Sequence, residues 1–345
     1  MASAAVNSVS DKLNLSGTHS PLEVQIRRNG MTESRHFVHL VVATPDGKIL
    51  LERGKPERMT FARSANKMLQ ALPFLESGAV EAFGLEAKHI SLAMASHSSE
   101  PEHVAVVQDW LSRLGLSEAD LECGAHLPSN IQAAHRMIAA GDKPNKAHNN
   151  CSGKHANFLS LAVHKGWPTR GYLRMDHPVQ QSWIGTIEMM AQVNLSAQNA
   201  AVDGCGIPTI AMPLANLAYA LARFADPVDL PAHRKEAIAQ LCQAVWQEPW
   251  YMAGSERLCS AVNSSYAQQV LAKVGAEGVF TAALIKEGLG LALKVEDGNE
   301  RAANVALLWA LEKLGYDLSA LESYARPELK NWAGQSVGDI IVHDL

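Results

Sequence analysis

Ser64 and Lys67 are the residues of this chain whose types and spacing first suggest chemistry. They lie three positions apart at the start of an apolar helical run, so the hydroxyl and the amine share one helix face. This is the Ser-x-x-Lys arrangement of serine hydrolases that use an amine as the base. A lysine accepts a proton only as the neutral amine, so burial or a nearby cation would have to lower its pKa from about 10.4 to about 7. The spacing alone is common, and most copies of it are surface residues of a helix.

The elements that must position these two residues include strands from both ends of the chain. Strands are predicted at Leu22–Arg28, 37–43, 49–52, 278–285 and 289–296. The second and third are joined by Pro45-Asp46-Gly47, which predicts a hairpin turn. The last two are joined by Lys286-Glu287-Gly288 and predict another hairpin.

Helical spacing of apolar residues covers the middle of the chain. Helices are predicted to open at Ser64, at Pro101 and near Cys151, and to occupy about 180–193, 214–224, 233–247 and 300–315. Pro73 should kink or end the first of them.

This order of elements predicts an α+β fold. An antiparallel sheet collects the N- and C-terminal strands, with flanking helices, and the middle of the chain forms a helical lobe. We expect residues 1–20 to form a loose N-terminal tail and residues 21–345 to form a single catalytic unit. Its sheet part should cover about 21–62 and 273–345, and its helical lobe about 63–272.

The composition excludes several classes of protein. The chain has 345 residues, of which 47% are apolar and 19% charged, and its net charge of −5 gives no reason to expect nucleic acid or an anionic membrane as a partner. The five widely spaced cysteines indicate a reducing compartment and not a disulfide framework. The longest apolar stretch, Ile210–Ala222, is interrupted by Pro213 and Asn216, and residues 1–20 lack the pattern of a secretory signal. We therefore expect a cytoplasmic protein.

Five short segments resemble, in the same order, those of one known family. They are Phe61-Ala-Arg-Ser-Ala-Asn-Lys67, Ala95-Ser-His-Ser-Ser-Glu100, Asn149-Asn-Cys-Ser-Gly-Lys-His155, Asp203-Gly-Cys-Gly-Ile-Pro208 and Lys273-Val-Gly-Ala-Glu-Gly-Val279. Together they are similar to the rhizobial-type, or class 3, L-asparaginases of the asparaginase II sequence family. The resemblance implies a fold similar to that of serine β-lactamases and penicillin-binding proteins. In those relatives a Lys-Thr-Gly segment lies on an inner strand, and here Val274 takes the place of the threonine.

The resemblance implies two Ser–Lys pairs in the active site, Ser64 with Lys67 and Ser96 with Lys273. Two ammonium groups in one site disfavour each other's protonation, so that one amine stays neutral near pH 7. We expect Ser64 to be the nucleophile and Lys67 its base, with Ser96 and Lys273 relaying a proton to the leaving ammonia or stabilising the acyl-enzyme. Without the resemblance, Ser96 would be interpreted as a turn hydroxyl and Lys273 as a solvated lysine of a helix.

Cys151, Lys154 and Cys205 are a second group, which the resemblance implies binds zinc. Cys151 and Lys154 are three positions apart at a helix start, and Cys205 lies in a Gly-rich turn that could approach them. Thiolates are usual zinc ligands, whereas lysine is not and binds only as the neutral amine. Three protein ligands would leave a fourth position for water or substrate. The residues alone favour two buried structural thiols, and a disulfide or an oxidised thiol at both cysteines is a third alternative.

Arg63, His155 and Asp203 flank these motifs and complete the predicted site. Arg63 could hold the α-carboxylate of an amino-acid substrate, and Asp203 could accept its α-ammonium group. His155 could support the metal site. His97 also lies in one of the motifs, without an assigned role.

The resemblance therefore implies an L-asparaginase, an amidohydrolase that converts L-asparagine to L-aspartate and ammonia through an acyl-enzyme, with a nearby zinc site. The resemblance also implies a homodimer. Two alternatives remain. One is a β-lactamase-like serine amidase or peptidase with another substrate, and the other is a zinc- or thiol-dependent binding protein on this fold.

Overall fold

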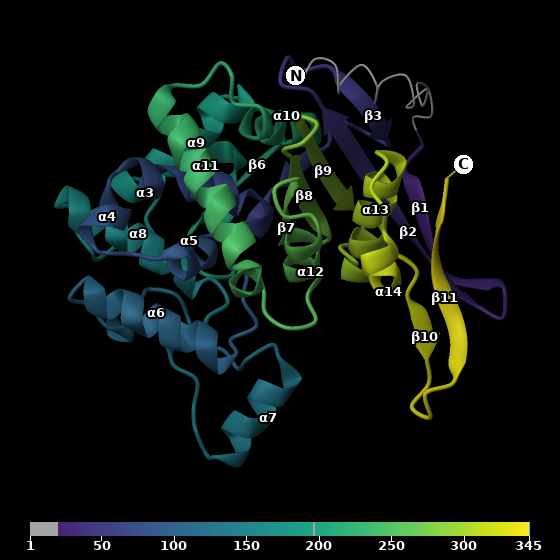
Figure 1. Cartoon of the computed structure of the whole chain (residues 1–345), viewed down its shortest axis with the longest axis horizontal. Coiled ribbons are helices and arrows are strands. Elements are labelled where there is room, and N and C mark those ends of the chain that lie inside the picture. The colour runs from purple at the N-terminus through teal and green to yellow at the C-terminus, as the bar shows by residue number, and fades with distance from the viewer. Residues whose placement is uncertain (1–19, 196, 345) are drawn as a thin grey trace. The chain divides into compact units, whose positions relative to one another are not determined.

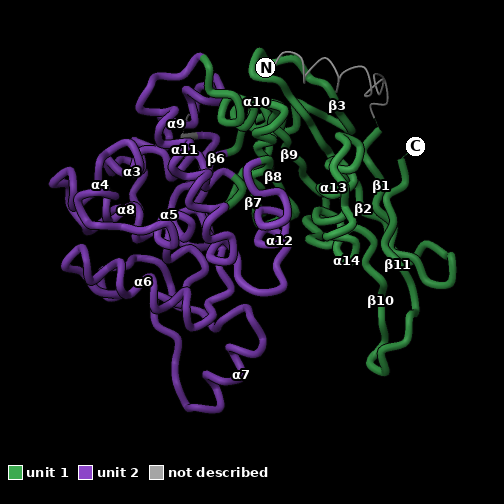
Figure 2. Tube along the Cα trace, viewed as in Figure 1, with its two compact units in different colours: residues 1–65, 211–228, 269–345 green, residues 66–210, 229–268 purple. Residues whose placement is uncertain are grey.

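The structure is a computed structural model that describes residues 20–195 and 197–344 of the chain. These residues form two compact units, which Figure 2 distinguishes by colour. Unit 1 contains the described residues up to Ala65, Ala211–Val228 and the residues from Gln269 onward, and unit 2 contains Asn66–Ile210 and Asp229–Gln268. Nearly all of the predicted N-terminal tail lies outside the described residues.

Unit 1 is built around one antiparallel sheet (Figure 1). Its strands follow the order β10-β11-β1-β2-β9-β8-β7, and β3 pairs with β2. Their bounds are β1 (Leu22–Arg28), β2 (Met31–Ala43), β3 (Ile49–Arg53), β7 (Val270–Gly275), β8 (Val279–Leu284), β9 (Leu289–Val295), β10 (Glu328–Lys330) and β11 (Ser336–His343). The N-terminal strands β1 and β2 pair with the C-terminal strands β11 and β9. The predicted α+β fold, with a sheet drawn from both ends of the chain, is confirmed.

Helices α10 (Leu214–Ala225) and α13 (Glu300–Lys313) pack against this sheet. Helix α10 lies so close to β9 that a Cβ atom at Gly290 would overlap the backbone of Ala218 and Ala222. Only glycine allows the helix and the strand to approach this closely. Unit 1 also contains β4 (Met59–Phe61), which pairs with 211–213 of β6 (Pro208–Pro213), and the short helices η6 (Ser319–Leu321) and α14 (Glu322–Ala325).

Unit 2 is largely helical. Its α-helices are α2 (Lys67–Gln70), α3 (Leu72–Glu76), α4 (Ala79–Ala82), α5 (Ala87–Ala93), α6 (Pro101–Arg113), α7 (Ile131–Ala139), α8 (Ser152–Lys165), α9 (Pro178–Ala191), α11 (Ala232–Gln247) and α12 (Leu258–Ser265). Shorter elements are η2 (Glu118–Asp120), η3 (Lys146–His148), η4 (Ala197–Asn199), η5 (Pro249–Met252) and β5 (Ala200–Val202). The short helix η1 (Arg63–Asn66) spans the boundary, and only Asn66 of it belongs to unit 2.

Helix α8 is the buried centre of unit 2. It packs against α3, α5 and α6, and every residue from Ser152 to Ala162 is buried. The helix ends at Gly166, whose φ of +66° suits a left-handed C-terminal cap. Because the first three turns of α8 are shielded from water, their polar side chains must find partners inside the protein.

Most predicted elements are confirmed, with differences around Ser64 and Lys273. The helix predicted from Ser64 is divided into η1, α2 and α3, and Pro73 lies in the first turn of α3. Lys273 lies on β7 and is 0% exposed, so the alternative of a solvated helix lysine is wrong. Strand β7 ends the sheet order, so the Lys273-Val274-Gly275 segment is not on an inner strand. No helix in the described ranges is long and apolar enough to cross a membrane.

Candidate active site

Lys67 opens helix α2 and is only 1% exposed. Its Nζ atom lies 3.1 Å from Ser96 Oγ and 3.2 Å from Cys151 Sγ, and it donates to the carbonyl oxygen of Ala95. Burial has the largest effect on this amine and lowers its pKa. A charged Cys151 would raise the pKa of Lys67, whereas the positive charge of Lys154 lowers it further. Lys67 is therefore biased toward the neutral amine, which is the form that a base requires.

The contacts of a neutral Lys67 amine have a defined direction. Such an amine has two N–H donors and one lone pair. The Ala95 carbonyl oxygen can only accept a hydrogen bond. The Cys151 thiol donates its S–H to a hydrogen bond with Cys205, so its sulfur accepts from Lys67. Both contacts therefore use an N–H of Lys67. Ser96 Oγ is the third close partner of the Lys67 amine, at 3.1 Å.

Ser96 lies in a turn after α5 that is fixed by backbone and carboxylate hydrogen bonds. Its N–H donates to the Met252 carbonyl at 3.1 Å. The Glu100 carboxylate accepts hydrogen bonds from the Ser98 hydroxyl and from the N–H and hydroxyl of Ser255. These bonds hold the turn against residues 252–255, and they give the Ser96 hydroxyl a defined place beside Lys67.

Cys151, Lys154 and Cys205 lie together in unit 2. Cys151 is the N-cap of α8, Lys154 is in the first turn of the helix, and Cys205 lies in the turn between β5 and β6. Lys154 Nζ lies 3.0 Å from Cys205 Sγ, and the Cys151 thiol donates a hydrogen bond to the same sulfur. Each of the three residues is at most 4% exposed. The structure thus places the three predicted metal ligands in one buried cluster.

This cluster contains one thiolate. The hydrogen bond from Cys151, helped by Lys154, lowers the pKa of Cys205 to about 4. The same hydrogen bond, together with burial, raises the pKa of Cys151 to about 12. Burial lowers the pKa of Lys154, but the sulfur atoms of Cys151 and Cys205 and the carboxylate of Asp203 outweigh burial and raise it. At neutral pH, Cys205 and Lys154 therefore form a buried ion pair beside a neutral Cys151 thiol.

The donor atoms of this cluster fit zinc in type, but two of them carry protons. Two sulfur atoms and one nitrogen are a donor set that zinc accepts once all three are deprotonated. Binding must therefore displace one proton from Cys151 and one from Lys154. Among residues 20–195 and 197–344, no group of three or more His, Cys, Asp or Glu side chains is placed to hold a metal. A metal at this position thus needs Lys154 as its third protein ligand.

Asp203 and His155 lie beside the cluster. Asp203 begins the turn that carries Cys205, and its carboxylate stabilises the Lys154 ammonium. His155 is 0% exposed, and its Nδ1 atom lies 2.8 Å from the Tyr172 hydroxyl. Burial lowers the pKa of His155 to about 3, so the ring is neutral. Its Nε2 atom has no hydrogen-bond partner within the described part of the chain.

Ser64 and Lys273 belong to unit 1, whereas Lys67, Ser96 and the three ligand candidates belong to unit 2. The chain passes from unit 1 to unit 2 after Ala65, so the boundary falls inside the Ser-x-x-Lys segment. In unit 1, the Nζ atom of Lys273 donates to the Val274 carbonyl at 2.7 Å.

Strands β7 and β8 support the segment that carries Ser64. The Thr281 hydroxyl of β8 donates to the Ala65 carbonyl at 2.7 Å. A Cβ atom at Gly275 of β7 would lie only 3.0 Å from the Ala62 carbonyl oxygen and the Ala65 nitrogen, so this segment lies directly on the strand. The backbone on both sides of Ser64 is therefore fixed by the sheet of unit 1.

Arg63, the residue before Ser64, has a φ of +50°. This is the left-handed region, which costs a residue other than glycine roughly 1 kcal/mol or more. The chain turns sharply here, and Ser64 follows as the second residue of η1.

Asn66 and Gln70 are buried polar residues to which the sequence analysis gives no role. They flank Lys67 and are 2% and 4% exposed. Their side-chain oxygens, Asn66 Oδ1 and Gln70 Oε1, have no donor among the residues that the structure describes. Buried amide oxygens of this kind call for a water molecule or a ligand as donor. The sequence signal for them was two amides four positions apart in an otherwise apolar run.

The sequence of the chain matches the family described as L-asparaginase II over residues 24–342. Because this match covers nearly the whole chain, the protein belongs to the L-asparaginase II family. At the level of the family it is an amidohydrolase. No curated protein sequence matches the chain significantly.

Solved structures align with most of the chain at low similarity. The native form of Mglu is 14% identical with a TM-score of 0.45, and the alignment covers 92% of this chain and 72% of Mglu. The Bacillus subtilis glutaminase YbgJ, solved as a covalent complex with 5-oxo-L-norleucine, is 13% identical with a TM-score of 0.37, covering 90% and 96%. A candidate β-lactamase from Bacteroides dorei is 12% identical with a TM-score of 0.38, covering 90% and 98%.

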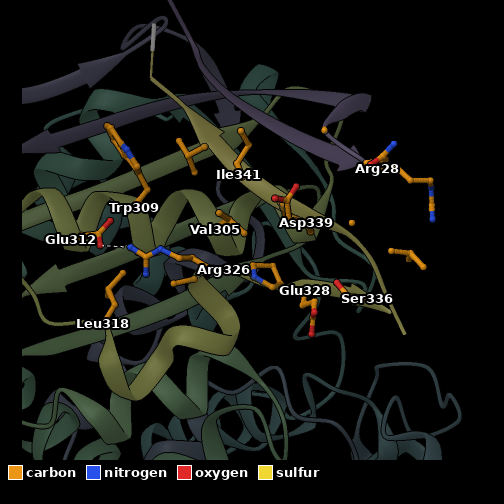
Figure 3. Close-up of a pocket in the computed structure, with 18 residues that line it drawn as sticks. Arg28, Val305, Trp309, Glu312, Leu318, Arg326, Glu328, Ser336, Asp339 and Ile341 are labelled. Carbon is orange, nitrogen blue, oxygen red and sulfur yellow. Dashed lines mark hydrogen bonds and ion pairs between the residues drawn. The ribbon is translucent and has the colours of Figure 1, made fainter. Parts of the chain in front are cut away.

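A groove of about 1050 Å³ in unit 1 contains none of the candidate residues (Figure 3). It lies between α13 and the hairpin of β10 and β11, with Val305 and Trp309 on its helical side and Ile341 on its strand side. Arg326 in its wall pairs with Glu312 at 2.6 Å. None of the serine, lysine and cysteine residues described above lines the groove.

Proposed function

We propose that this protein is an L-asparaginase that hydrolyses the side-chain amide of L-asparagine to L-aspartate and ammonia. The observation that carries the proposal is the Lys67 amine. In a chain of the L-asparaginase II family, this amine is 1% exposed, has a lowered pKa and lies 3.1 Å from the hydroxyl oxygen of Ser96. A neutral amine of this kind can activate a serine for attack on an amide.

Ser64 is the proposed nucleophile, with Lys67 as its base. The Ser64 oxygen bonds to the side-chain amide carbon of the substrate while its proton passes to Lys67. The tetrahedral species then collapses, the proton on Lys67 passes to the amide nitrogen, and the C–N bond breaks to release ammonia. Water next attacks the ester and gives a proton to Lys67, which returns it to the Ser64 oxygen as L-aspartate leaves.

Ser96 and Lys273 are proposed to move protons and to stabilise charge. The Ser96 hydroxyl contacts Lys67, so it is suited to relay a proton from Lys67 to the leaving nitrogen. An ammonium group on Lys273, which is 0% exposed, would stabilise negative charge that develops in the transition state. Backbone N–H groups, including that of Ser64, are the proposed oxyanion hole.

Arg63, Asp203 and His155 are proposed to bind the substrate. The Arg63 guanidinium would pair with the α-carboxylate, and the Asp203 carboxylate with the α-ammonium group. His155 offers a buried Nε2 atom that has no partner in the described ranges, and that atom suits a polar group of the substrate.

Cys151, Lys154 and Cys205 are the proposed zinc ligands. When bound, zinc would supply a Lewis acid beside the Lys67 amine and tune substrate affinity. The protein's own contribution is to hold Cys205 as a thiolate and to keep Lys154 within reach of it. The homodimer and the cytoplasmic location stay predictions.

Replacement of the nucleophile tests this proposal. Ser64→Ala should reduce ammonia release from L-asparagine by about 10⁴-fold or more, as for other activated serines. Ser91→Ala is a matched control, because Ser91 is a buried serine of α5 that donates to the Glu248 carbonyl. Full turnover by Ser64→Ala would sink the assignment. A loss seen only in Ser96→Ala would transfer the role of nucleophile to Ser96.

Substrate comparison separates the remaining alternatives. Release of ammonia from L-asparagine should exceed release from L-glutamine, and a chromogenic β-lactam should not be hydrolysed. Turnover of the β-lactam alone would favour a β-lactamase-like amidase. A non-catalytic binding protein would keep its function in Lys67→Ala and lose it in Cys151→Ser.

A further inference from the structure

His97 is a fully buried histidine next to Ser96, and both of its ring nitrogens are used. Its Nε2 atom lies 2.8 Å from Ser152 Oγ, and its Nδ1 atom accepts the N–H of Ser99 at 3.2 Å. The Ser152 hydroxyl donates to the Ala147 carbonyl at 2.8 Å, so it must accept the proton of Nε2. The ring is therefore held as the neutral Nε2–H tautomer, with a donor on one side and an acceptor on the other.

These hydrogen bonds join two segments that meet at Lys67. On one side, His97 follows Ser96, and its Nδ1 bond closes the turn at Ser99, where φ is +61°. On the other side, Nε2 is bonded to Ser152, the residue after Cys151, and the His97 N–H donates to the Asn150 carbonyl at 3.1 Å. His97 thus ties the turn of Ser96 to the N-terminus of α8.

The position of the ring is fixed by stacking. It stacks on the ring of His103 with centroids 5.0 Å apart and planes 12° apart, and His103 stacks in turn on Trp250 at 4.1 Å and 16°. His103 and Trp250 leave the His97 ring little freedom to tilt, because interiors are close-packed and stacked rings cannot slide without opening a void.

We infer that His97 is a positioning residue that sets the distance between Ser96 and Cys151, and so shapes the place where the Lys67 amine lies. Lys67 Nζ contacts the side chains of both residues, at 3.1 Å and 3.2 Å. A change in their separation would lengthen at least one of these contacts. The role in turnover rests on the proposed function, whereas the geometric role does not.

Three variants of the full chain test this inference. His97→Ala removes both ring bonds, and His97→Gln keeps an N–H near the position of Nε2. His89→Ala is the matched control, because His89 is also 0% exposed, accepts the Glu86 N–H on Nδ1 at 3.0 Å and bonds Asp109 through Nε2 at 3.1 Å. His89 packs edge-on against Trp110 and has no contact with the turn of Ser96 among its described bonds.

Two readouts are measured on each variant, and one of them does not depend on turnover. His97→Ala should lower kcat for L-asparagine by about tenfold to a hundredfold with little change in KM, as expected for a small misplacement of catalytic groups. His97→Gln should recover most of this loss, and His89→Ala should leave kcat near that of the wild type. Alkylation of Cys151, followed by peptide mass spectrometry, should be faster in His97→Ala than in either other variant.

The inference is overturned if His97→Ala and His89→Ala behave alike in both readouts, or if His97→Gln is as impaired as His97→Ala. If the wild type releases no ammonia from L-asparagine, the proposed function fails. The alkylation rates of Cys151 still decide whether His97 sets the geometry.

Discussion

The Lys67 end and the Lys154 end of the buried cluster are built from the same kinds of group, yet the two amines differ. Each lysine is 1% exposed and lies within 3.2 Å of a cysteine sulfur. The pKa of Lys67 is lowered, whereas the pKa of Lys154 is raised. The neighbour at the Lys67 end is the Cys151 thiol, and the neighbour at the Lys154 end is the Cys205 thiolate.

The difference shows that burial alone does not determine the charge of an internal lysine. Burial disfavours the ammonium form at both ends, but only the Lys154 amine is recorded in direct contact with the Cys205 thiolate, which helps to outweigh burial there. The single proton between the two sulfur atoms is bonded to Cys151, so the negative charge is on the side of Lys154. One end is therefore suited to act as a base, and the other is suited to an ion pair or a metal.

The largest expected effect is a loss of turnover, and it should follow replacement of Lys67 but not replacement of Lys154. Lys67→Met should lower kcat by about 10³-fold, because removal of a general base costs 10²- to 10⁴-fold. Lys154→Met should have a much smaller effect on kcat. Ammonia release measured on both variants decides the point, and equal losses would show that the two ends do not have separate roles.

The next effect is on stability, at the Lys154 end. Cys205→Ser should lower the free energy of unfolding by roughly 3 kcal/mol, because it leaves the Lys154 ammonium without its buried counter-ion. Cys242→Ser is the control, because Cys242 is a buried thiol of α11 whose pKa is raised to about 12, so it is uncharged. Urea unfolding of both variants measures the difference. A loss in Cys205→Ser no larger than in Cys242→Ser would refute the ion pair.

The stability difference between the wild type and Cys205→Ser should depend on pH. The pKa of Cys205 is lowered from 9.0 to about 4 on folding, so its stabilising contribution is complete above the ordinary pKa and is lost as the pH falls toward 4. The difference should therefore shrink between pH 8 and pH 5, by up to about 1 kcal/mol per unit. Unfolding curves at several pH values test this, with Cys242→Ser expected to show no such trend.

The smallest expected effect is on the number of protons that the protein releases when zinc binds. Binding of one zinc ion near pH 7.5 should release about two protons, one from Cys151 and one from Lys154, because Cys205 is already a thiolate. Calorimetric titration in buffers of different ionisation enthalpy measures this number. Release of about three protons would mean that Cys205 is a thiol in the metal-free protein, and the contrast between the two ends would then be lost.

Sequence patterns led to predictions for pairs that are local in the chain. Ser64 with Lys67, and Cys151 with Lys154, were predicted as pairs because residues three positions apart share a helix face, and the pairing of Ser64 with Lys67 stays a prediction. The contact of Lys67 with Ser96 joins residues that are 29 positions apart, and no periodicity encodes it. The direction of the proton between the two cysteines also follows from burial and neighbouring charge, which a sequence does not display.

The fold was predicted best where apolar residues mark an element. Strands β1 and β3 lie where they were predicted, whereas β2 begins at Met31 and not at 37, because its first five residues are exposed or half-buried. All six residues of β7 are buried, so Lys273 interrupts an apolar run instead of marking an exposed face. Strands β10 and β11 are mostly exposed or half-buried, and they lack the apolar alternation that would have revealed them.

The left-handed backbone at Arg63 has a consequence for how this position varies under selection. Glycine adopts a φ of +50° without penalty, so a library randomised at this codon and sorted for folded protein alone should be enriched in glycine and asparagine. The same library sorted for growth that depends on asparagine breakdown should instead retain arginine. The ratio of the arginine frequencies in the two sorted libraries would measure how strongly selection maintains the guanidinium group rather than the turn.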